Sequence, residues 1–597
     1  MKPLQRTALA SVINLILLGM SDAHAADPQA LEKRIKELES RLAKMDQLER
    51  RLEKLDQLNA ITNQAPLIEK QASAAPEIEK LTKKVNTLQR KLEVQDEVTT
   101  GALSKIPNFE AGADGFKVTS TDKKHQLRIG GTVQTDYKAF LDNAYSAGFG
   151  SGFASSQQTS ALPAGPDSVS LRQARMTLDG YVYSDLYFKI MADFAQTSNT
   201  ANLLPDAYLD YNYDPAVSLL VGKFKPSISL ERLQGDADTA FLERGFPTNL
   251  APNRDAGIQV HGGFGKPGYK AERNPGPIDV KNAFTYQVGI TDGTGDSGNS
   301  YGSGTNSNSN SLNSNATTFN PLTGKYSTTV TPSSFANDKE FDGRIFAQPF
   351  QHSGYSWLEG FGVGLAGSYS NPNHQAINAQ KSLIGQSTIV DYTQINNATG
   401  NAASGTITAN GLTVTNTNKS IITSNGASYR IYPQAFWYSG PFGLMGEYVE
   451  SSQTLNASAL GSKGNNISQT NKASQVQVSY VVTGEDNTFN GVKPMRSFDP
   501  FKGSWGALQL VGRWSELDID KSTFALLDPT KSISRATAYT VGANWFLNKN
   551  ALIRLDYEDV SFLGGAGTFT GSGSTTKYSV TNRPTEQIFS TRFQLAF

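Results

Sequence analysis

The chain has 597 residues with 54 basic and 54 acidic side chains, so its formal net charge is zero, and it contains no cysteine. Zero net charge gives no bulk attraction to nucleic acid, and a chain without cysteine has neither disulfides nor thiol chemistry. Mean hydropathy is negative, at −0.39, but a β-barrel strand faces lipid only at every second residue, so a membrane protein is not excluded.

Residues 1–25 have the pattern of a secretory signal peptide. Lys2 and Arg6 precede an apolar stretch from Leu9 to Gly19, and Ala23-His24-Ala25 is a small-x-small cleavage site. A membrane-spanning helix is the competing interpretation, but it needs about 20 apolar residues and this stretch is far shorter. We therefore expect export and removal of this segment.

Residues 26–100 are rich in charged and aliphatic side chains and nearly free of aromatics. Two apolar runs follow the 3-4 spacing of a coiled-coil seam: Leu31, Ile35, Leu38, Leu42 and Met45, then Ile78, Leu81, Val85, Leu88 and Leu92. Each run covers about two heptads, which is marginal for an isolated helix. We predict a periplasmic α-helical coiled-coil oligomerisation segment here, with a solvated single helix as the alternative.

From 116 to 597 the sequence alternates apolar with polar residues in short runs, separated by tracts rich in Asn, Ser, Thr and Gly. The clearest hairpin turns at Tyr183-Ser184-Asp185, after which Phe188 and Ile190 share one face and Lys189 lies on the other. Charges at alternate strand positions are costly in a dry core. They can instead face a water-filled lumen while the apolar face meets lipid.

Runs of this kind predict sixteen strands. They lie near residues 126–140, 174–178, 186–194, 204–213, 217–226, 256–263, 281–290, 340–348, 360–370, 429–438, 442–451, 472–482, 505–515, 534–547, 551–561 and 584–597. Tight turns are predicted after even-numbered strands, at 183–185, 214–216, 439–441 and 548–550, although the even-strand connectors at 264–280 and 483–504 are longer. The polar tracts around 291–339 and 371–428 lack the apolar residues of a core, so we expect mobile external loops.

The end of the chain indicates where it resides. Phe589, Phe593 and Leu595 alternate with polar residues before the terminal Phe597, a pattern typical of the last strand of an outer-membrane barrel, and we interpret Phe597 as an assembly signal. An amphipathic edge strand of a soluble sandwich is the alternative for this segment, and a repeat-built adhesin is the alternative for the whole region, without a fixed period to support it. The predicted fold is all-β: a 16-stranded antiparallel transmembrane β-barrel over 116–597.

Several phrases in this region match one family in order and spacing. They include Leu127-Arg128-Ile129-Gly130-Gly131, Leu171-Arg172-Gln173-Ala174-Arg175, Val221-Gly222-Lys223-Phe224-Lys225-Pro226, Phe241-Leu242-Glu243-Arg244, Leu510-Val511-Gly512-Arg513-Trp514 and Thr540-Val541-Gly542-Ala543-Asn544-Trp545. The chain resembles the phosphate-selective porin O and P family. The resemblance implies a sixteen-stranded, water-filled, trimeric porin whose third long loop folds inward to narrow the pore.

Basic residues on the predicted lumen face are the candidates for pore lining and anion binding. They are Arg175, Lys189, Lys223, Lys225, Lys281, Arg344, Arg430, Arg513, Arg554 and Arg592, and the inward loop expected at 227–255 adds Arg232, Arg244 and Arg254. Lys223 and Lys225 flank Phe224, so we expect them to point together. Acidic residues, among them Asp193, Asp210 and Glu558, share this face, and the arginine run typical of the family's phosphate channels is missing, so a broad polar pore remains the alternative.

No catalytic, metal-binding or cofactor-binding constellation stands out. After signal removal the chain retains His125, His261, His352 and His374, which are scattered without metal-ligand spacing, and neither a phosphate-binding loop nor a nucleophile elbow occurs. We therefore expect no enzyme but an outer-membrane porin for small hydrophilic solutes, with a preference for anions such as phosphate. Expected partners are outer-membrane lipids, small anions or polar solutes and two further copies in a homotrimer. A structural alternative is a tether that binds the cell wall or a periplasmic partner through 26–100.

Overall fold

The computed structural model describes residues 79–91, 93–94, 106–141, 167–195, 204–277, 280–293, 316–320, 325–329, 339–372, 375–392, 405–409, 412–416, 421–458, 465–570 and 577–597. The chain divides into two compact units, Met1–Phe109 and Glu110–Phe597. The predicted signal peptide and the first coiled-coil run lie outside the described residues. The boundaries predicted for the domains, at 25, 100 and 116, stay predictions.

In the first unit, residues 79–91 form an α-helix, as the second coiled-coil run predicts. Lys83 and Glu79 form an ion pair of 2.8 Å across one turn, and Leu81 and Val85 are half-buried while Leu88 is exposed. Pairing of this helix with a second copy stays a prediction. Among the described helices, none is both long and apolar enough to cross a membrane.

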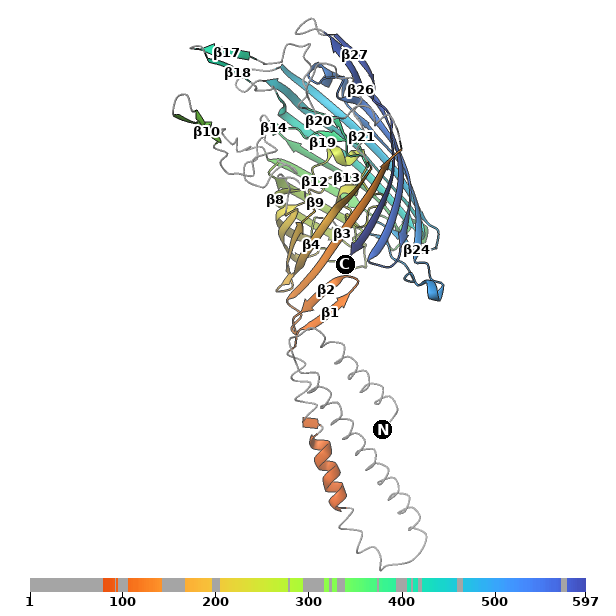
Figure 1. Ribbon diagram of the computed structural model, residues 1–597. Helices are drawn as coiled ribbons and strands as arrows, with labels where there is room; N and C mark the ends of the chain where they lie inside the picture. The colour runs from red at the N-terminus through yellow and green to blue at the C-terminus, as the bar shows by residue number, and fades with distance from the viewer. Residues whose placement is uncertain are drawn as a thin grey trace, which may run out of the picture. The chain divides into compact units, whose positions relative to one another are not determined.

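In the second unit, antiparallel strands close into a barrel (Figure 1). The barrel strands, in order around the ring, are β3 (Gln126–Phe140), β4 (Ser168–Val182), β5 (Leu186–Asp193), β6 (Asp206–Asp214), β7 (Val217–Phe224), β8 (Asp255–Phe264), β9 (Phe284–Thr291), β12 (Glu340–Ala347), β13 (Phe361–Ser370), β19 (Ile421–Ser439), β20 (Phe442–Ser458), β21 (Asn465–Val481), β24 (Ala507–Asp518), β25 (Ile533–Phe546), β26 (Ala551–Thr570) and β28 (Glu586–Ala596). The described main sheet has 20 strands, of which β1, β2, β14 and β27 lie outside this ring, leaving sixteen. The pairing of β28 with β3, with Arg592 opposite Asp136, closes the barrel.

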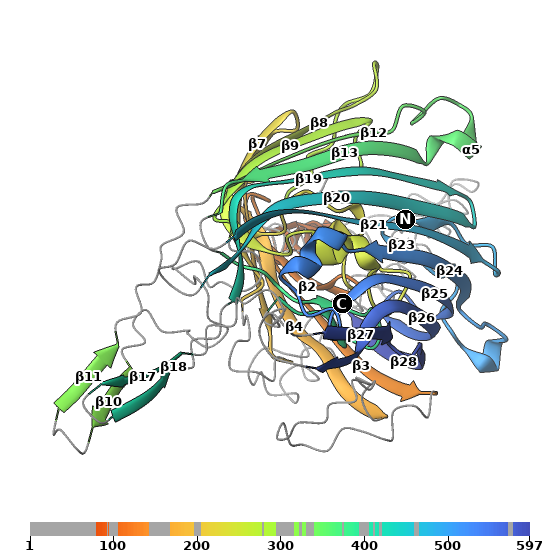
Figure 2. The same ribbon diagram turned by 90° about the horizontal axis from the view of Figure 1, so that it is seen from above.

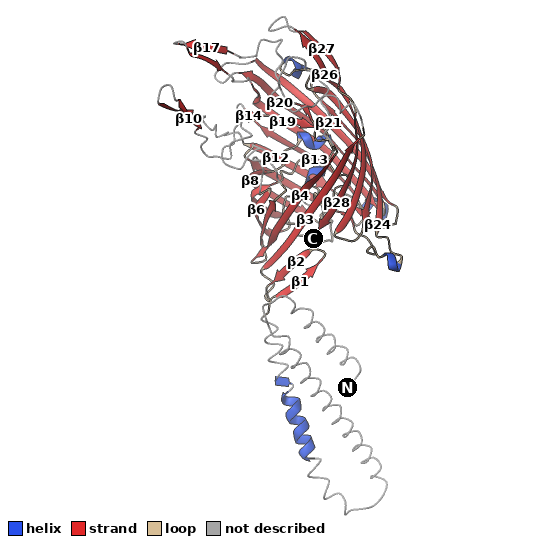
Figure 3. Cartoon of the chain, viewed as in Figure 1, coloured by secondary structure: helices blue, strands red, loops and turns tan. Residues whose placement is uncertain are grey.

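Two of the smaller described strands precede the barrel and the other small elements lie in connectors, as the secondary-structure colouring shows (Figure 3). They are β1 (Asn108–Gly112), β2 (Gly115–Thr119), β10 (Ala316–Asn320), β11 (Lys325–Thr329), β14 (Gln375–Ala376), β15 (Gln380–Lys381), β16 (Thr388–Val390), β17 (Gly405–Ala409), β18 (Leu412–Asn416), β22 (Asn487–Thr488), β23 (Gly491–Val492), β27 (Lys577–Asn582), the helices α4 (Leu230–Leu233) and α5 (Ser356–Glu359), and the 3₁₀ turns η2 (Phe246–Leu250), η5 (Pro500–Lys502) and η6 (Lys521–Ala525).

The two faces of the barrel wall have opposite chemistry. On β28, the apolar side chains Phe593 and Leu595 are 55% and 46% exposed, whereas Arg592 and Ser590 on the alternate positions are buried at 2% and 0%. Exposed apolar and buried polar side chains reverse the usual order of a soluble protein. This inversion is expected where one face meets lipid and the other an enclosed lumen, and it excludes the soluble-sandwich alternative for the C-terminal strand.

The terminal residue sits in the seam where the barrel closes. Phe597 and Gly131 exchange two backbone hydrogen bonds, of 2.8 and 2.9 Å, and the ring of Phe597 lies edge-on to Phe116 at 6.4 Å. A Cβ on Gly131 would lie 2.8 Å from the Cζ atom of Phe597, so a larger residue at this strand position would require the Phe597 ring to shift. The role of Phe597 as an assembly signal stays a prediction.

The predicted strands and tight turns are confirmed, with differences in length. Turns at 183–185, 215–216, 440–441 and 547–550 join β4 to β5, β6 to β7, β19 to β20 and β25 to β26. The strands β19, β20, β21 and β26 extend well beyond their predicted ends. The strand predicted at 281–290 begins only at Phe284.

Part of the lumen is filled by an apolar core. The connector between β13 and β19 contributes Leu383, Ile389, Val390 and Tyr392, all at most 2% exposed, which pack with Tyr432 and other wall residues. The expectation that 371–428 is only a mobile external loop is therefore wrong for the described segment 375–392. Its few apolar residues are spaced so that nearly all of them can be buried inside the barrel, and mean composition does not reveal this.

Candidate pore constriction

The connector between β7 and β8, residues 225–254, folds into the barrel as the third long loop was predicted to do (Figure 2). Its short helix α4 is capped by Ser229, whose Oγ accepts a hydrogen bond from the backbone N–H of Arg232. On the wall strand β20, the carboxylate of Glu447 accepts hydrogen bonds from Ser229 Oγ at 3.0 Å and from the N–H of Leu230 at 2.8 Å. One end of the inward loop is thus attached to the lumen face of β20.

Three predicted lumen arginines hold the far part of this loop. Arg513 on β24 donates to the carbonyl of Glu243 at 2.7 Å, Arg592 on β28 donates to Leu242 O at 2.8 Å, and Arg554 on β26 donates to Phe241 O at 3.1 Å. All three guanidinium groups are buried. Hydrogen bonds from charged donors are stronger than neutral ones, so these arginines fix the loop across the lumen.

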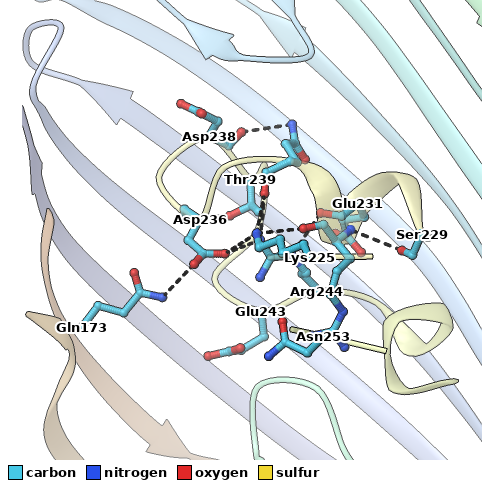
Figure 4. A network of polar contacts seen from close by, with 12 residues as sticks. Gln173, Lys225, Ser229, Glu231, Asp236, Asp238, Thr239, Glu243, Arg244 and Asn253 are labelled. Carbon is cyan, nitrogen blue, oxygen red and sulfur yellow. Dashed lines mark hydrogen bonds and ion pairs between the residues drawn. The ribbon is translucent and has the colours of Figure 1, made fainter. Parts of the chain in front are cut away.

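A second group of basic residues surrounds one loop carboxylate (Figure 4). Asp236 pairs with Arg175 on β4 and with Arg244 of the loop, and it lies 3.6 Å from Lys225 Nζ and 3.9 Å from Arg254 Nη2. We call these five residues the Asp236 cluster. The cluster brings together four residues predicted from the sequence, which are separated by up to 79 positions.

The charges around the Asp236 cluster do not cancel. Arg175 also pairs with Asp193 at 2.8 Å. Asp206 forms ion pairs with Arg254 at 2.7 Å and with Lys189 at 3.4 Å. The five bases are Arg175, Lys189, Lys225, Arg244 and Arg254, and the three acids are Asp193, Asp206 and Asp236, so the formal sum is 5 − 3 = +2. This region of the lumen is therefore basic although the whole chain is neutral.

The neighbours of Asp236 decide its protonation. Burial opposes ionisation, but Lys225, Arg244 and Arg175 outweigh it and hold the pKa of the Asp236 carboxyl well below its usual range. Burial also lowers the pKa of Lys225, and Asp236 opposes that shift. The carboxylate is therefore charged at neutral pH, in a position where four basic side chains converge on its oxygens.

A family model described as "Phosphate-selective porin O and P" matches residues 145–353 and 369–597. The chain belongs to this family. Membership confirms the resemblance found in the sequence and the prediction of an outer-membrane porin rather than an enzyme.

Three proteins similar to this chain differ in how much of each sequence the similarity covers. Porin O of Pseudomonas aeruginosa is 26% identical over 139 residues, which cover 23% of this chain and only 28% of that relative. Outer-membrane expressed OmpT of Vibrio cholerae is 11% identical, with 79% of this chain and 98% of OmpT covered and a TM-score of 0.40. The anion-selective porin from Comamonas acidovorans is 10% identical, with 79% and 100% covered and a TM-score of 0.37.

Arg172 is a site residue of the porin that the sequence did not single out. Its guanidinium pairs with Glu243 of the inward loop at 2.7 Å. Burial opposes the shift, but this arginine lowers the pKa of Glu243 to about 2. The register of β3 against β4 slips between Gln134 and Thr135, and such a bulge reverses which side chains face the lumen. Strict alternation of side chains, counted back from Arg175, therefore puts Arg172 on the lipid-facing side, whereas the bulge turns it toward the lumen.

The other predicted wall residues have separate surroundings. Arg344 stacks over the ring of Phe346 and donates to Gln434 at 3.0 Å. Arg430 pairs with Glu340, and Arg232 of the loop donates to the carbonyl of Thr248. These side chains point into the barrel, but the partners just named lie outside the Asp236 cluster.

The predicted position of Lys281 needs correction, and that of Lys223 stays a prediction. Lys281 lies in the connector before β9, is 52% exposed and pairs with Glu272 at 3.9 Å, so it is not on a wall strand. Lys223 is aligned in the ladder with Ala207 and Ala256, whereas Lys225 follows the end of β7. Both side chains are buried, and the expectation that they point together stays a prediction. Gly222, which precedes Lys223, has a φ of +135°, a local irregularity in the alternation on which that prediction relies.

Connectors from the opposite end of the barrel also reach the inward loop. Ser227 Oγ donates to the carbonyl of Pro277, in the connector between β8 and β9, at 2.7 Å. Gln234 Nε2 donates to Phe489 O, in the connector between β21 and β24, at 2.6 Å. The two even-strand connectors that were longer than expected for periplasmic turns therefore help to narrow the lumen.

Asp238 lies beside the Asp236 cluster, and its titration leads us to expect that the ion selectivity of the channel depends on pH. Burial raises the pKa of its carboxyl to about 6, although Arg554 opposes the shift. A raised pKa means that the folded protein favours the neutral form of Asp238. Its contribution to folding stability is therefore complete below pH 3.8, the ordinary pKa of the group, and is lost as pH rises through 6. We expect anion preference to increase as pH falls from 8 to 5, and to increase less in Asp238→Asn, as measured by reversal potentials. An equal pH response in the variant would assign the effect to other groups.

What the constriction can do follows from its donors. Guanidinium and ammonium groups donate hydrogen bonds to oxyanions and can replace part of their hydration. Among the described residues, no group of His, Asp and Glu is arranged to hold a metal ion. The geometry therefore suits transient binding of small anions.

Proposed function

We propose that this porin is a passive outer-membrane channel for small hydrophilic solutes with a preference for anions of the phosphate type. The observation that supports the proposal most is the formal charge of +2 that the Asp236 cluster carries together with its ion-pair neighbours Lys189, Asp193 and Asp206, where the inward loop crosses the lumen. A fixed positive charge in a narrow, partly dehydrated passage attracts anions and repels cations.

Reconstitution into planar bilayers tests the proposal. Under a potassium chloride gradient we expect a reversal potential of the sign that indicates chloride permeation, and added inorganic phosphate should reduce the chloride current by occupying the same cations. A potential of the opposite sign would contradict anion preference and leave the porin itself intact. A chloride preference without a phosphate effect would support a general anion pore.

A broad polar pore is the second candidate, because acids also lie on the lumen face. Arg128 and Asp179 pair at 2.8 Å, and Lys189 and Asp206 pair at 3.4 Å, on the same wall arc as the Asp236 cluster. Paired charges of both signs favour polar solutes without strong selection by charge. Permeation of neutral sugars as fast as that of anions of equal size in liposome swelling would favour this candidate.

We infer a homotrimer from the height of the wall. The consecutive strands β5, β6, β7, β8, β9, β12 and β13 have only eight to ten residues, while about 9–11 are needed to cross a bilayer at the usual tilt. Apolar side chains such as Ile190, Leu209 and Val288 are exposed along this low wall. Packing against another copy would cover them without exposing the rim to lipid, and the mass of the detergent-solubilised porin tests the stoichiometry.

Residues 26–100 are proposed to assist assembly on the periplasmic side, as the seam spacing of the sequence suggests. Deleting this segment should leave the conductance per pore unchanged. If the trimer dissociates, the segment is an assembly device. If the trimer persists but the outer membrane detaches from the cell wall, the tether function is favoured.

A further inference from the structure

The connector between β21 and β24 has two halves that fold in opposite directions. Its first half carries β22 and β23 and turns inward, where Phe489 is buried against Leu230 and Phe436. Its second half, residues 493–505, turns outward over the rim. There Phe498 packs edge-on against Trp545 at 5.3 Å, and the indole N–H of Trp545 donates to Trp505 O at 2.7 Å. We call residues 493–505 the rim hook.

The rim hook rests on the lipid-facing side of the wall. Trp545 shares its face of β25 with Tyr539 and Val541, which are 59% and 57% exposed. The ring of Phe498 packs against this tryptophan and against Trp505. The rim hook is therefore continuous with the outer apolar surface, at the end of the barrel that carries the tight turns and the C-terminus. In outer-membrane barrels this is the periplasmic end.

Local hydrogen bonds make the rim hook an ordered loop. The backbone of Asp499 exchanges hydrogen bonds with Ser504, and its carboxylate caps η5 by accepting from the N–H groups of Phe501 and Lys502. The N–H of Phe498 donates to Leu547 O at 2.6 Å. The apolar tip that this scaffold presents is therefore held in place and exposed.

The exposed side chains of the rim hook are aromatic and basic. Phe501 is 99% exposed, Met495 75% and Trp505 63%. Arg496 and Lys502 are exposed as well, against the single acid Asp499, so residues 494–505 have a formal charge of 2 − 1 = +1. Lys493 lies at the inward end of the rim hook, close enough to Asp238 to favour ionisation of that carboxyl. Large apolar side chains fully in water are unfavourable, whereas aromatic and basic groups together suit the boundary between acyl chains and anionic headgroups.

We propose that the rim hook is a membrane anchor that inserts Phe501 and Met495 into the periplasmic phospholipid leaflet and places its basic residues among anionic headgroups. A second copy of the chain is the less favoured occupant, because β24 and β25 lie outside the arc of short strands. The proposal depends on the barrel lying in a bilayer and is independent of solute selectivity.

Site-directed fluorescence tests the anchor, since a chain without cysteine accepts a single labelled one. Ser497→Cys, exposed within the rim hook, would carry an environment-sensitive dye in the full-length porin. Asn490→Cys, exposed on the inward half of the same connector, is the matched control. Heat-modifiable migration in gels verifies that both variants are folded.

In vesicles of phosphatidylethanolamine and phosphatidylglycerol, we expect the dye at 497 to lose fluorescence to acyl-brominated lipid and to resist aqueous iodide. The dye at 490 should show the reverse. Adding Phe501→Asp to Ser497→Cys should weaken quenching by brominated lipid, and Arg496→Glu with Lys502→Glu should weaken it only when phosphatidylglycerol is present. Iodide quenching at 497 equal to that at 490 would contradict the proposed membrane anchor. Protection of the dye at 497 from both quenchers would also contradict it, because a covering protein would then occupy the rim hook.

Discussion

Lys225→Glu should lower the anion-over-cation permeability ratio of the porin by at least about tenfold. The change reduces the formal charge around the Asp236 cluster from +2 to 4 − 4 = 0. One unit charge acts on an ion about 8 Å away with about 2 kcal/mol at an effective dielectric constant near 20, and the substitution alters two units. Reversal potentials in a potassium chloride gradient measure the ratio.

Lys281→Glu is the matched control for this experiment. It makes the same change of charge at an exposed connector residue outside the wall strands, where water and salt screen it. We expect little shift, and shifts of equal size in the two variants would show that selectivity arises from diffuse charge. Adding Lys223→Glu to Lys225→Glu should contribute less than the first substitution, because Lys223 is aligned with Ala207 and Ala256.

Asp236→Asn should act in the opposite direction. Loss of this carboxylate leaves five bases against two acids, a formal charge of 5 − 2 = +3, and it frees donors that now bind the loop. Anion preference should rise, and phosphate should reduce the chloride current at lower concentration. A variant with unchanged selectivity would place the solute path away from Asp236.

Arg592→Ala is expected to destabilise the porin by about 3–5 kcal/mol, because removal of one partner leaves a buried charge uncompensated. Arg592 donates two hydrogen bonds of 2.7 Å to the carboxylate of Asp136, which is fully buried, and a third to Leu242 O of the inward loop. The loop loses one attachment as well, so single-channel currents should become larger or noisier. Equilibrium unfolding in urea, followed by tryptophan fluorescence in lipid vesicles, measures the loss.

Arg535→Ala provides the comparison for Arg592→Ala. Arg535 pairs with Asp518 at 2.5 Å, but both side chains are more than a third exposed, and such pairs contribute about 0–1 kcal/mol. Similar losses in the two variants would refute the special role of the buried pair. Replacing both buried partners, with Asp136→Leu and Arg592→Met, should recover part of the stability, since two apolar side chains leave no unpaired charge.

Much of the constriction could be predicted because alternation along a strand is a local property. Arg175, Lys189, Arg344 and Arg513 face the lumen as their neighbours imply. Prediction failed where the backbone departs from regular alternation. The bulge opposite Gln134 turns Arg172 inward, and no composition or spacing of side chains signals such a slip.

The amino-acid sequence alone determined the sixteen strands, the side of each that meets lipid and the membership of a porin family, since a period of two needs only neighbouring residues. The tertiary structure alone decided what the basic residues do. Arg554 and Arg592 bind loop carbonyls whereas Lys225 and Arg244 converge on Asp236. Such assignments depend on distances between groups hundreds of residues apart, and these exist only once the barrel has closed and its connectors have folded inward.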